Sequence, residues 1–187
     1  MGIRKELAAG LAAVLLAAAV QSTGSASAAV GECRAAAGAG EIATTATSWV
    51  NPRDFLLPIN RARAEVDVRP VTWSAALERA AENHATRLAS FGCEPEPSGA
   101  PGVGETIVSV PEDVSVPEAI ALWVDQKAHY DYETNSCSPG KRCSDYTQIV
   151  WRDTSMIGGA VARCENGQKI IVVLYNPQGN LVGERPY

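Results

Sequence analysis

The sequence predicts an α+β fold, in which helices and antiparallel strands are mixed. Two β-rich runs, residues 156–164 and 169–175, flank Asn166-Gly167, the dipeptide that most strongly signals a short hairpin turn. Amphipathic helical patterns precede this hairpin along the chain. They do not alternate with strands in the rhythm that is typical of a parallel sheet, which indicates the α+β class.

Two helices are predicted in the first half of the globular region. The first begins around Asp54, whose side chain is placed to accept hydrogen bonds from free N–H groups, and Pro58 is tolerated there only near the first turn. The second helix follows Ser74 as its N-cap, and Gly92 can end it. Its apolar face contains Leu77, Ala81, His84 and Leu88.

Loops and two further helices are predicted before the hairpin. Residues 93–117 are rich in proline and glycine and are expected to form an ordered loop. Ser115-Val116-Pro117-Glu118 has the pattern of a capping box with proline in the first turn, and it predicts a third helix through Lys127. After another loop, a short helix is predicted over residues 146–151.

The N-terminus has the three parts of a secretory signal peptide. Arg4 and Lys5 form a basic start, residues 7–20 are apolar, and Ala26-Ser27-Ala28 is a typical cleavage signal. The apolar run is shorter than the roughly 20 residues that a transmembrane helix needs. We therefore expect a signal peptide over residues 1–28, a flexible segment over residues 29–50, and a single domain over residues 51–187 of a secreted, extracellular protein, without a transmembrane anchor.

The net charge excludes some classes of partner. The whole chain carries −5, and cleavage would remove Arg4, Lys5 and Glu6, which together carry +1, so the mature chain would carry −6. Nucleic acids and anionic membranes attract proteins through basic clusters, and the sequence contains no basic run. We therefore expect no nucleic-acid partner.

The five cysteines indicate a disulfide framework with one thiol left over. Cys33 lies in the flexible segment and is the candidate for the unpaired thiol, either free or linked to another chain. The other four allow more than one pairing. With only two histidines and no CxxC motif, a structural zinc site is not expected. We expect the protein to be a monomer.

Several ordered motifs resemble one known family. Residues 144–152, SDYTQIVWR, look like a G-H-Y-T-Q-V-V-W-R signature, and residues 175–180, YNPQGN, are similar to a C-N-Y-x-P-P-G-N signature. Residues 183–187, GERPY, match a common ending of plant members. The chain from about Asp54 to Tyr187 thus resembles the CAP superfamily, and most closely its plant pathogenesis-related 1 (PR-1) group. The resemblance implies a three-layer α-β-α sandwich.

The resemblance also implies a disulfide pairing. PR-1 proteins usually have six cysteines, and the two positions that lack a cysteine hold Gly159 and Val173, which would pair with each other in the family. The implied disulfides are Cys93–Cys164 and Cys137–Cys143. The first closes a long loop and would stabilise the fold by about 4 kcal/mol in the chain-entropy model.

A cleft lined by two histidines and two glutamates is common in CAP proteins, and its residues are mostly replaced here. By position the histidines correspond to Pro97 and Asp145, and the glutamates to Glu105 and Gln126. Only Glu105 keeps the family residue type. Because two carboxylates without imidazole make a weak zinc site, we expect no metal, no cofactor and no catalytic residue at this degenerate cleft.

Other polar residues have structural interpretations. His84 is expected to pack in the core, and His129 to lie on the surface. Asn60 and Gln148 sit beside the cleft in the family and are expected to hydrogen-bond to the backbone. Ser98 lies near Glu105 in sequence, but no histidine remains at a cleft position to activate it as a nucleophile.

Three functional hypotheses follow from the resemblance. The first is a non-enzymatic protein of plant defence in the extracellular space (apoplast), with a sterol or another lipid as ligand. The second is a precursor that releases the peptide 177–187 by cleavage between Asn176 and Pro177, for recognition by a receptor; alternatively, these residues cap the sheet. The third is an extracellular hydrolase, against which the altered cleft argues.

Overall fold

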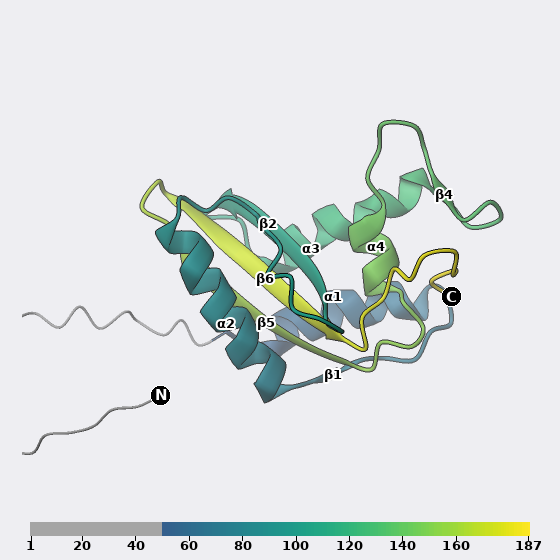
Figure 1. The fold of residues 1–187 in the computed structure, drawn as a ribbon, viewed down its shortest axis with the longest axis horizontal. Coiled ribbons are helices and arrows are strands. Elements are labelled where there is room, and N and C mark those ends of the chain that lie inside the picture. The colour runs from purple at the N-terminus through teal and green to yellow at the C-terminus, as the bar shows by residue number, and fades with distance from the viewer. Residues whose placement is uncertain (1–49) are drawn as a thin grey trace, which may run out of the picture. The chain divides into compact units, whose positions relative to one another are not determined.

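The computed structural model describes residues 50–187, so the predicted signal peptide and Cys33 lie outside the described residues. The described part has three layers (Figure 1). A four-stranded sheet lies between helix α2 on one face and helices α1, α3 and α4 on the other. The predicted α+β class and the implied α-β-α sandwich are both confirmed.

The main sheet has the strand order β1-β5-β6-β2. Strands β5 (Met156–Arg163) and β6 (Gln168–Asn176) form the predicted hairpin and pair antiparallel along their whole length. Strand β2 (Gly104–Pro111) pairs antiparallel with β6, and the two-residue β1 (Thr72–Trp73) pairs parallel with β5. A second, two-stranded ladder joins β3 (Tyr130–Asp131) to β4 (Ser136–Cys137).

Two helices begin as their sequences predict. Helix α2 (Ala75–Ser90) is capped by Ser74, and Gly92 follows its end with a positive φ of 87°. Helix α3 (Val116–Val124) begins with the complete capping box of Ser115 and Glu118 and continues into the 3₁₀ helix η1 (Asp125–His129). The polar side chains at these starts satisfy N–H groups that the first helical turn leaves free.

The first helix corrects two expectations. Helix α1 spans Pro52–Ala64, and its N-cap is Asn51, whose side chain accepts a hydrogen bond from the backbone N–H of Arg53. Asp54 lies within the first turn and is not the cap. Pro58 lies inside the helix, beyond its first turn, and the helix continues to Ala64 although proline has no N–H to donate.

Two further boundaries differ from the prediction. The region 93–117 is not loop throughout, because it contains β2. Between Gly104 and Pro111 this strand has mostly β-branched residues, which favour strands, and the surrounding prolines and glycines hid that signal. The short helix α4 spans Ser144–Ile149 and thus begins and ends two residues earlier than expected.

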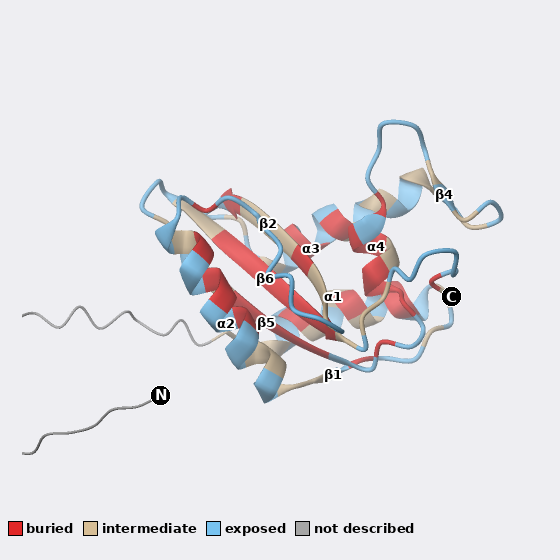
Figure 2. Ribbon diagram, viewed as in Figure 1, coloured by how far each residue is buried: buried red, intermediate tan, exposed pale blue. Residues whose placement is uncertain are grey.

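The core is divided by the sheet into two clusters. Ile170, Val172 and Leu174 of β6 pack with α2, whereas the alternate residues Ile171, Val173 and Tyr175 pack with the helices on the other face. All six are buried, which makes β6 the most buried strand, drawn red in Figure 2. A strand covered on both faces is expected to be apolar without interruption, as residues 170–175 are.

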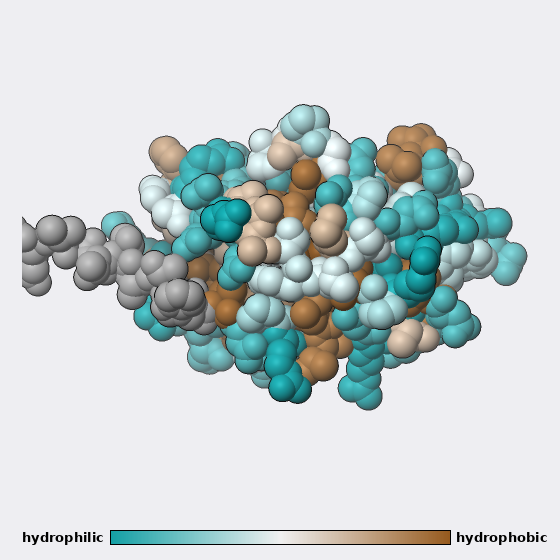
Figure 3. Space-filling model, turned by 90° about the horizontal axis from the view of Figure 1, so that it is seen from below, coloured by the Kyte–Doolittle hydropathy of each residue, from teal (hydrophilic) through white to brown (hydrophobic). Residues whose placement is uncertain are grey.

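Some large hydrophobic side chains remain exposed on the described part of the chain. Figure 3 shows hydrophobic residues on one face as separate patches between polar ones. The exposed residues are Leu57, Phe91, Leu122, Met156, Leu181 and Val182. Within residues 50–187, no helix is both long enough and apolar enough to cross a membrane.

Candidate functional site

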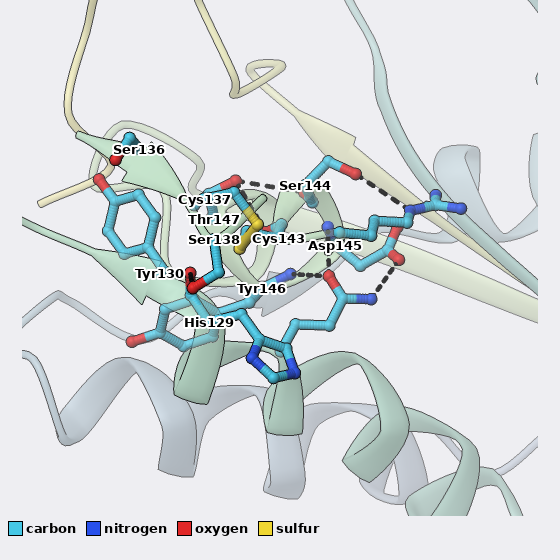
Figure 4. Close-up of a disulfide and its surroundings, with 12 residues drawn as sticks. His129, Tyr130, Ser136, Cys137, Ser138, Cys143, Ser144, Asp145, Tyr146 and Thr147 are labelled. Atoms are coloured by element: carbon cyan, nitrogen blue, oxygen red, sulfur yellow. Dashed lines mark hydrogen bonds and ion pairs between the residues drawn. A yellow bond between two sulfur atoms is a disulfide. The ribbon is translucent and has the colours of Figure 1, made fainter. Parts of the chain in front are cut away.

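Two of the four cleft positions meet between η1 and α4. The side-chain nitrogen of Gln126, on η1, donates to Oδ2 of Asp145, on α4, over 2.7 Å. The amide oxygen of Gln126 accepts hydrogen bonds from the backbone N–H groups of Asp145 and Tyr146, at 3.2 and 3.4 Å. Figure 4 shows these contacts as dashed lines around Asp145. One glutamine side chain therefore provides a hydrogen-bond acceptor for two backbone N–H groups in the first turn of α4 and a donor for the Asp145 carboxylate.

The second oxygen of Asp145 is engaged by a cation. Arg142 donates to Oδ1 over 2.9 Å, and most of the Arg142 side chain is exposed, while Asp145 is only 3 % exposed. A buried carboxylate needs such partners, because an isolated charge in the interior is costly. Both oxygens of Asp145 thus accept hydrogen bonds from protein groups, and burial limits the access of a ligand to the lone pairs that remain.

Glu105 lies at the start of β2 and organises the loop that precedes it. The backbone N–H of Ser98 donates to Oε2 of Glu105 over 2.7 Å, and the Ser98 hydroxyl donates to Oε1. The Ser98 oxygen in turn accepts a hydrogen bond from the backbone of Ala100. Pro97, which occupies the position of a family histidine, is exposed and has no side-chain donor or acceptor. The retained glutamate thus anchors a loop.

The described residues do not form one metal-binding constellation. Within residues 50–187, no hydrogen bond or ion pair links Glu105 to Gln126 or Asp145, and no group of three His, Cys, Asp or Glu side chains could hold a metal ion. Proline cannot coordinate, and both carboxylates are already bound to protein donors. This donor set does not fit the divalent metal of the family cleft.

Among residues 50–187, neither histidine ring is hydrogen-bonded or ion-paired to Glu105 or Asp145. Nε2 of His84 contacts the carbonyl of Glu96 at 2.9 Å, and Arg87 contacts its Nδ1 at 2.8 Å, so this buried ring is held by the protein as a core residue. His129 ends η1 and is half-buried, and its carbonyl accepts a hydrogen bond from Ser138 (Figure 4). Neither ring contacts Ser98, so no Ser-His pair exists among the described residues.

Asn60 and Gln148 bond to the backbone, as expected. Asn60 exchanges two hydrogen bonds with the backbone of Val71, at 2.8 and 3.0 Å. Gln148 is buried, and its side-chain oxygen accepts a hydrogen bond from the N–H of Gly179 over 2.9 Å. A Cβ atom on Gly104 would overlap the Gln148 amide, so the glycine lets β2 approach α4 closely.

A buried arginine supports the end of α4 and was not recognised from the sequence. Arg63 of α1 is fully buried, and its guanidinium donates to four carbonyls without a carboxylate partner. Those acceptors are Arg69, Ile149, Trp151 and Thr154, at 2.8 to 2.9 Å. Burial lowers the pKa of Arg63 to about 10. The sequence pattern alone does not distinguish a buried arginine from an exposed one.

The two disulfides join the pairs that the family resemblance implies. Cys93 is bonded to Cys164, which ties the end of α2 to the β5–β6 turn. Cys137 of β4 is bonded to Cys143 at the start of α4 (Figure 4). The second disulfide therefore holds the β3–β4 hairpin next to the helix that carries Asp145.

The proposed cleavage position lies at the end of β6. The carbonyl of Asn176 accepts a hydrogen bond from the N–H of Ser155 over 3.1 Å, and the carbonyl of Pro177 accepts one from Thr154 over 2.9 Å. Pro177 itself is exposed. In the segment that follows, residues 180–185 are exposed, whereas Pro186 is buried and Tyr187 half-buried.

Comparisons with known proteins agree with this fold. The profile of the CAP family, described as the cysteine-rich secretory protein family, matches residues 56–175. Pathogenesis-related protein PRMS of Zea mays is 44% identical over 140 residues, which cover 73% of this chain and 83% of that protein. Pathogenesis-related protein 1B of Nicotiana tabacum is 36% identical over 136 residues, which cover 72% and 80%.

The solved structures show the same architecture at lower identity. Venom allergen-like protein 4 of Schistosoma mansoni matches with a TM-score of 0.61 and 21% identity, covering 72% of this chain and 92% of that one. At this identity the likeness concerns the fold. Together with the family profile and the plant relatives, it leads to one conclusion: the chain belongs to the cysteine-rich secretory protein (CAP) family, in its pathogenesis-related protein 1 group.

Proposed function

We propose that this protein is a secreted, defence-related recognition protein without catalytic activity. One observation carries the proposal: each carboxylate at the four cleft positions, Glu105 and Asp145, is already bound by protein donors. These donors occupy one acceptor site on each carboxylate oxygen and thereby fix the orientation of both groups, whereas a general base or metal ligand must direct a lone pair at the substrate or ion. A cleft whose carboxylates are hydrogen-bonded to other groups of the protein favours ligand binding by shape complementarity over cleavage of a substrate bond.

The cleft proposal is tested by restoring the family residues. Calorimetric titration with Zn²⁺ should detect no site in the wild-type chain. The triple substitution Pro97→His, Gln126→Glu and Asp145→His should create a zinc site, because it supplies two imidazoles and a second carboxylate. Stoichiometric zinc in the wild-type protein, with a peptidase activity that chelation removes and Glu105→Gln abolishes, would favour the hydrolase hypothesis instead.

Secretion is the second part of the proposal. Both disulfides support it, because such bonds persist in oxidising compartments and are rare in the cytosol. The proposed organisation is a signal peptide over residues 1–28, a linking segment over 29–50 and the CAP domain over 51–187. Mass spectrometry of the exported protein should find an N-terminus at Ala29, and an intact Met1 would contradict this processing.

A sterol or another lipid is the ligand class that we propose. The support is the PR-1 resemblance, together with a net charge that disfavours binding through anionic head groups. Binding would therefore rest on the apolar part of the ligand. A labelled sterol should bind the domain saturably and be displaced by unlabelled sterol. Binding that does not saturate would remove this ligand class.

A peptide precursor is the second candidate function. The exposed position of Pro177, directly after β6, favours it. The hydrogen bonds to the carbonyls of Asn176 and Pro177 oppose it, because a protease must pull the bond out of these contacts. The test is mass spectrometry of extracellular fluid under pathogen challenge. The peptide 177–187 is expected there if the function is correct, and its absence counts against release.

A further inference from the structure

The last residues of the chain occupy a defined site on the β3–β4 hairpin. The ring of Tyr187 stacks on the ring of Tyr132, with centroids 4.7 Å apart and planes inclined by 13°. The Tyr132 hydroxyl donates to the main-chain oxygen of Tyr187 over 2.6 Å. The guanidinium of Arg185 lies 5.2 Å from the centre of the Tyr132 ring and donates to the carbonyl of Glu133 over 2.7 Å. Tyr132 therefore contacts two residues of the segment through three kinds of interaction.

Main-chain contacts set the register of the segment. The backbone N–H of Arg152 donates to the carbonyl of Pro186 over 2.6 Å, and its guanidinium donates to the carbonyl of Arg185 over 2.8 Å. The side chain of Asn135 donates to the carbonyl of Glu184 over 3.0 Å. The protein thus binds three successive carbonyls, those of Glu184, Arg185 and Pro186. Within residues 50–187, the Glu184 carboxylate itself makes no hydrogen bond or ion pair.

The site is built from parts that are ordered by their own contacts. The carboxylate of Asp131 accepts hydrogen bonds from the N–H groups of Glu133 and Thr134 in the hairpin turn. The Tyr130 hydroxyl donates to the Asn135 side chain over 2.7 Å. The Cys137–Cys143 disulfide holds the hairpin against α4. A surface held in this way keeps its shape better when the segment leaves, which lowers the cost of binding.

The chain just before the segment is loosely packed. Val182 is fully exposed, and a pocket of about 240 Å³ lies between the hairpin and the tail, lined in part by Asn135, Thr147, Leu181 and Gly183. The contacts are therefore concentrated at the end of the chain, and the connection at Val182 contributes little to them.

We propose that the hairpin and Arg152 form a peptide-binding site that recognises an Arg-Pro-Tyr segment. The site holds residues 183–187 within the chain, and it also binds the same segment as a separate peptide. Its ligand class is a short peptide with a tyrosine that stacks, a cationic residue two positions earlier, and free main-chain carbonyls. Binding at this site does not require natural cleavage. A peptide released by cleavage after Asn176 would remain on the protein through residues 183–187 and would leave only when these contacts break.

The test separates the segment from its site. In the wild-type chain the attached tail competes at a local concentration in the millimolar range. A specific protease sequence is therefore inserted in the full chain between Val182 and Gly183, and after cleavage the freed piece is dialysed away. A peptide of residues 183–187 with a fluorescent group at its N-terminus is then titrated, and its anisotropy is measured.

The expected result is saturable binding with one peptide per chain. Tyr132→Ala should weaken it about tenfold, because stacking and cation–π contacts are lost together. The peptide with Tyr187→Ala should lose a similar factor, and combining both changes should add little more. The matched control is the peptide with Glu184→Ala, which should bind within about twofold of the original because only the main chain of Glu184 is recognised.

Two results would overturn the proposal. One is no saturable binding by a cleaved protein that keeps its circular dichroism and both disulfides. The other is binding that Tyr132→Ala leaves unchanged. If cleavage unfolds the protein, hydrogen exchange in the uncut chain decides: Tyr132→Ala should speed exchange of the Arg152 amide, which donates to the Pro186 carbonyl, and leave β5 and β6 unchanged. A wild-type exchange rate at the Arg152 amide would also overturn the proposal.

Discussion

The side-chain nitrogen of Gln126 lies 2.7 Å from Oδ2 of Asp145, so an amide faces a carboxylate at two of the four cleft positions. The amide is neutral and donates a hydrogen bond to the carboxylate, so Gln126 brings no second negative charge to this position. Arg142 holds the other carboxylate oxygen at 2.9 Å. Gln126 and Arg142 therefore each hold one oxygen of the Asp145 carboxylate.

Gln126→Glu would place two carboxyl groups in hydrogen-bond contact. Because like charges disfavour ionisation, the pKa of the introduced carboxyl should rise on folding. A raised pKa stabilises the fold at low pH, and that contribution is lost as the pH rises from the unfolded value of about 4.3 through the raised folded value. We expect the variant to be about 2 kcal/mol less stable than the wild type at pH 7, and nearly equal at pH 4. Urea unfolding across this pH range measures the difference.

The double variant Gln126→Glu with Asp145→Asn is the control for this prediction. It restores a carboxylate–amide pair with the roles exchanged, so most of the stability at pH 7 should return. A loss in the single variant that is the same at pH 4 and pH 7 would contradict the electrostatic explanation.

Arg63→Met should destabilise the fold by about 4 kcal/mol, because four buried carbonyls lose a charged donor. Arg61→Met, an exposed position on the same helix, should change stability by less than about 0.5 kcal/mol. Arg63→Lys should recover only part of the loss, since an ammonium cannot reach all four acceptors. Urea unfolding with both disulfides intact gives the three values. Equal losses at positions 61 and 63 would show that the carbonyl contacts do not matter.

Gly159→Ala should cost about 2 kcal/mol because the new Cβ would lie 2.5 Å from Cε1 of Phe55. Gly159 is paired with Val173 across β5 and β6, and the Phe55 ring fills the space over the glycine. The substitution Phe55→Leu should therefore reduce the cost of Gly159→Ala in the double variant. Thermal unfolding of the four proteins tests the coupling, and strictly additive effects would disprove it.

Alkaline pH should destabilise the protein. Burial raises the pKa of Tyr175 and of Tyr146 well above the ordinary value of 10.0, and although a hydrogen bond to Thr106 opposes this at Tyr175, the rise remains. Above about pH 10 the folded state therefore retains protons that the unfolded state loses, so the free energy of unfolding falls as pH rises. The lowered pKa of Arg63 has the opposite effect on the free energy of unfolding over this pH range. It concerns one group, whereas the raised pKa values concern two tyrosines.

Tyr175→Phe tests the alkaline effect. The variant should lose less stability than the wild type between pH 9 and pH 11, in urea unfolding followed by circular dichroism with disulfides intact. The two stability curves should differ by a constant amount below pH 9. Parallel curves up to pH 11 would mean that Tyr175 does not contribute to the pH dependence.

Local sequence signals predicted the elements whose ends are set by nearby residues. The Ser115–Glu118 capping box, the Ser74 cap and the Asn166-Gly167 hairpin all involve groups within a few positions of each other. Strand β2 was missed because its glycine and proline boundaries resemble a loop, and its pairing partners in β6 lie 57 to 71 positions away in sequence. The pairing of strands that lie so far apart in sequence depends on tertiary contacts, which the periodicity of hydrophobic residues along the chain does not reveal.

By itself, the sequence determined the family, the α+β class and the replacement of the cleft histidines, because motif residues and their order are visible without coordinates. The tertiary structure decided what the replaced cleft does with its remaining acids. Asp145 meets Gln126 and Glu105 meets Ser98 only after folding, and Tyr187 reaches Tyr132 across 55 positions. Hydrogen bonds depend on distance and direction in space, so residue types can limit the possible partners, but only packing selects them.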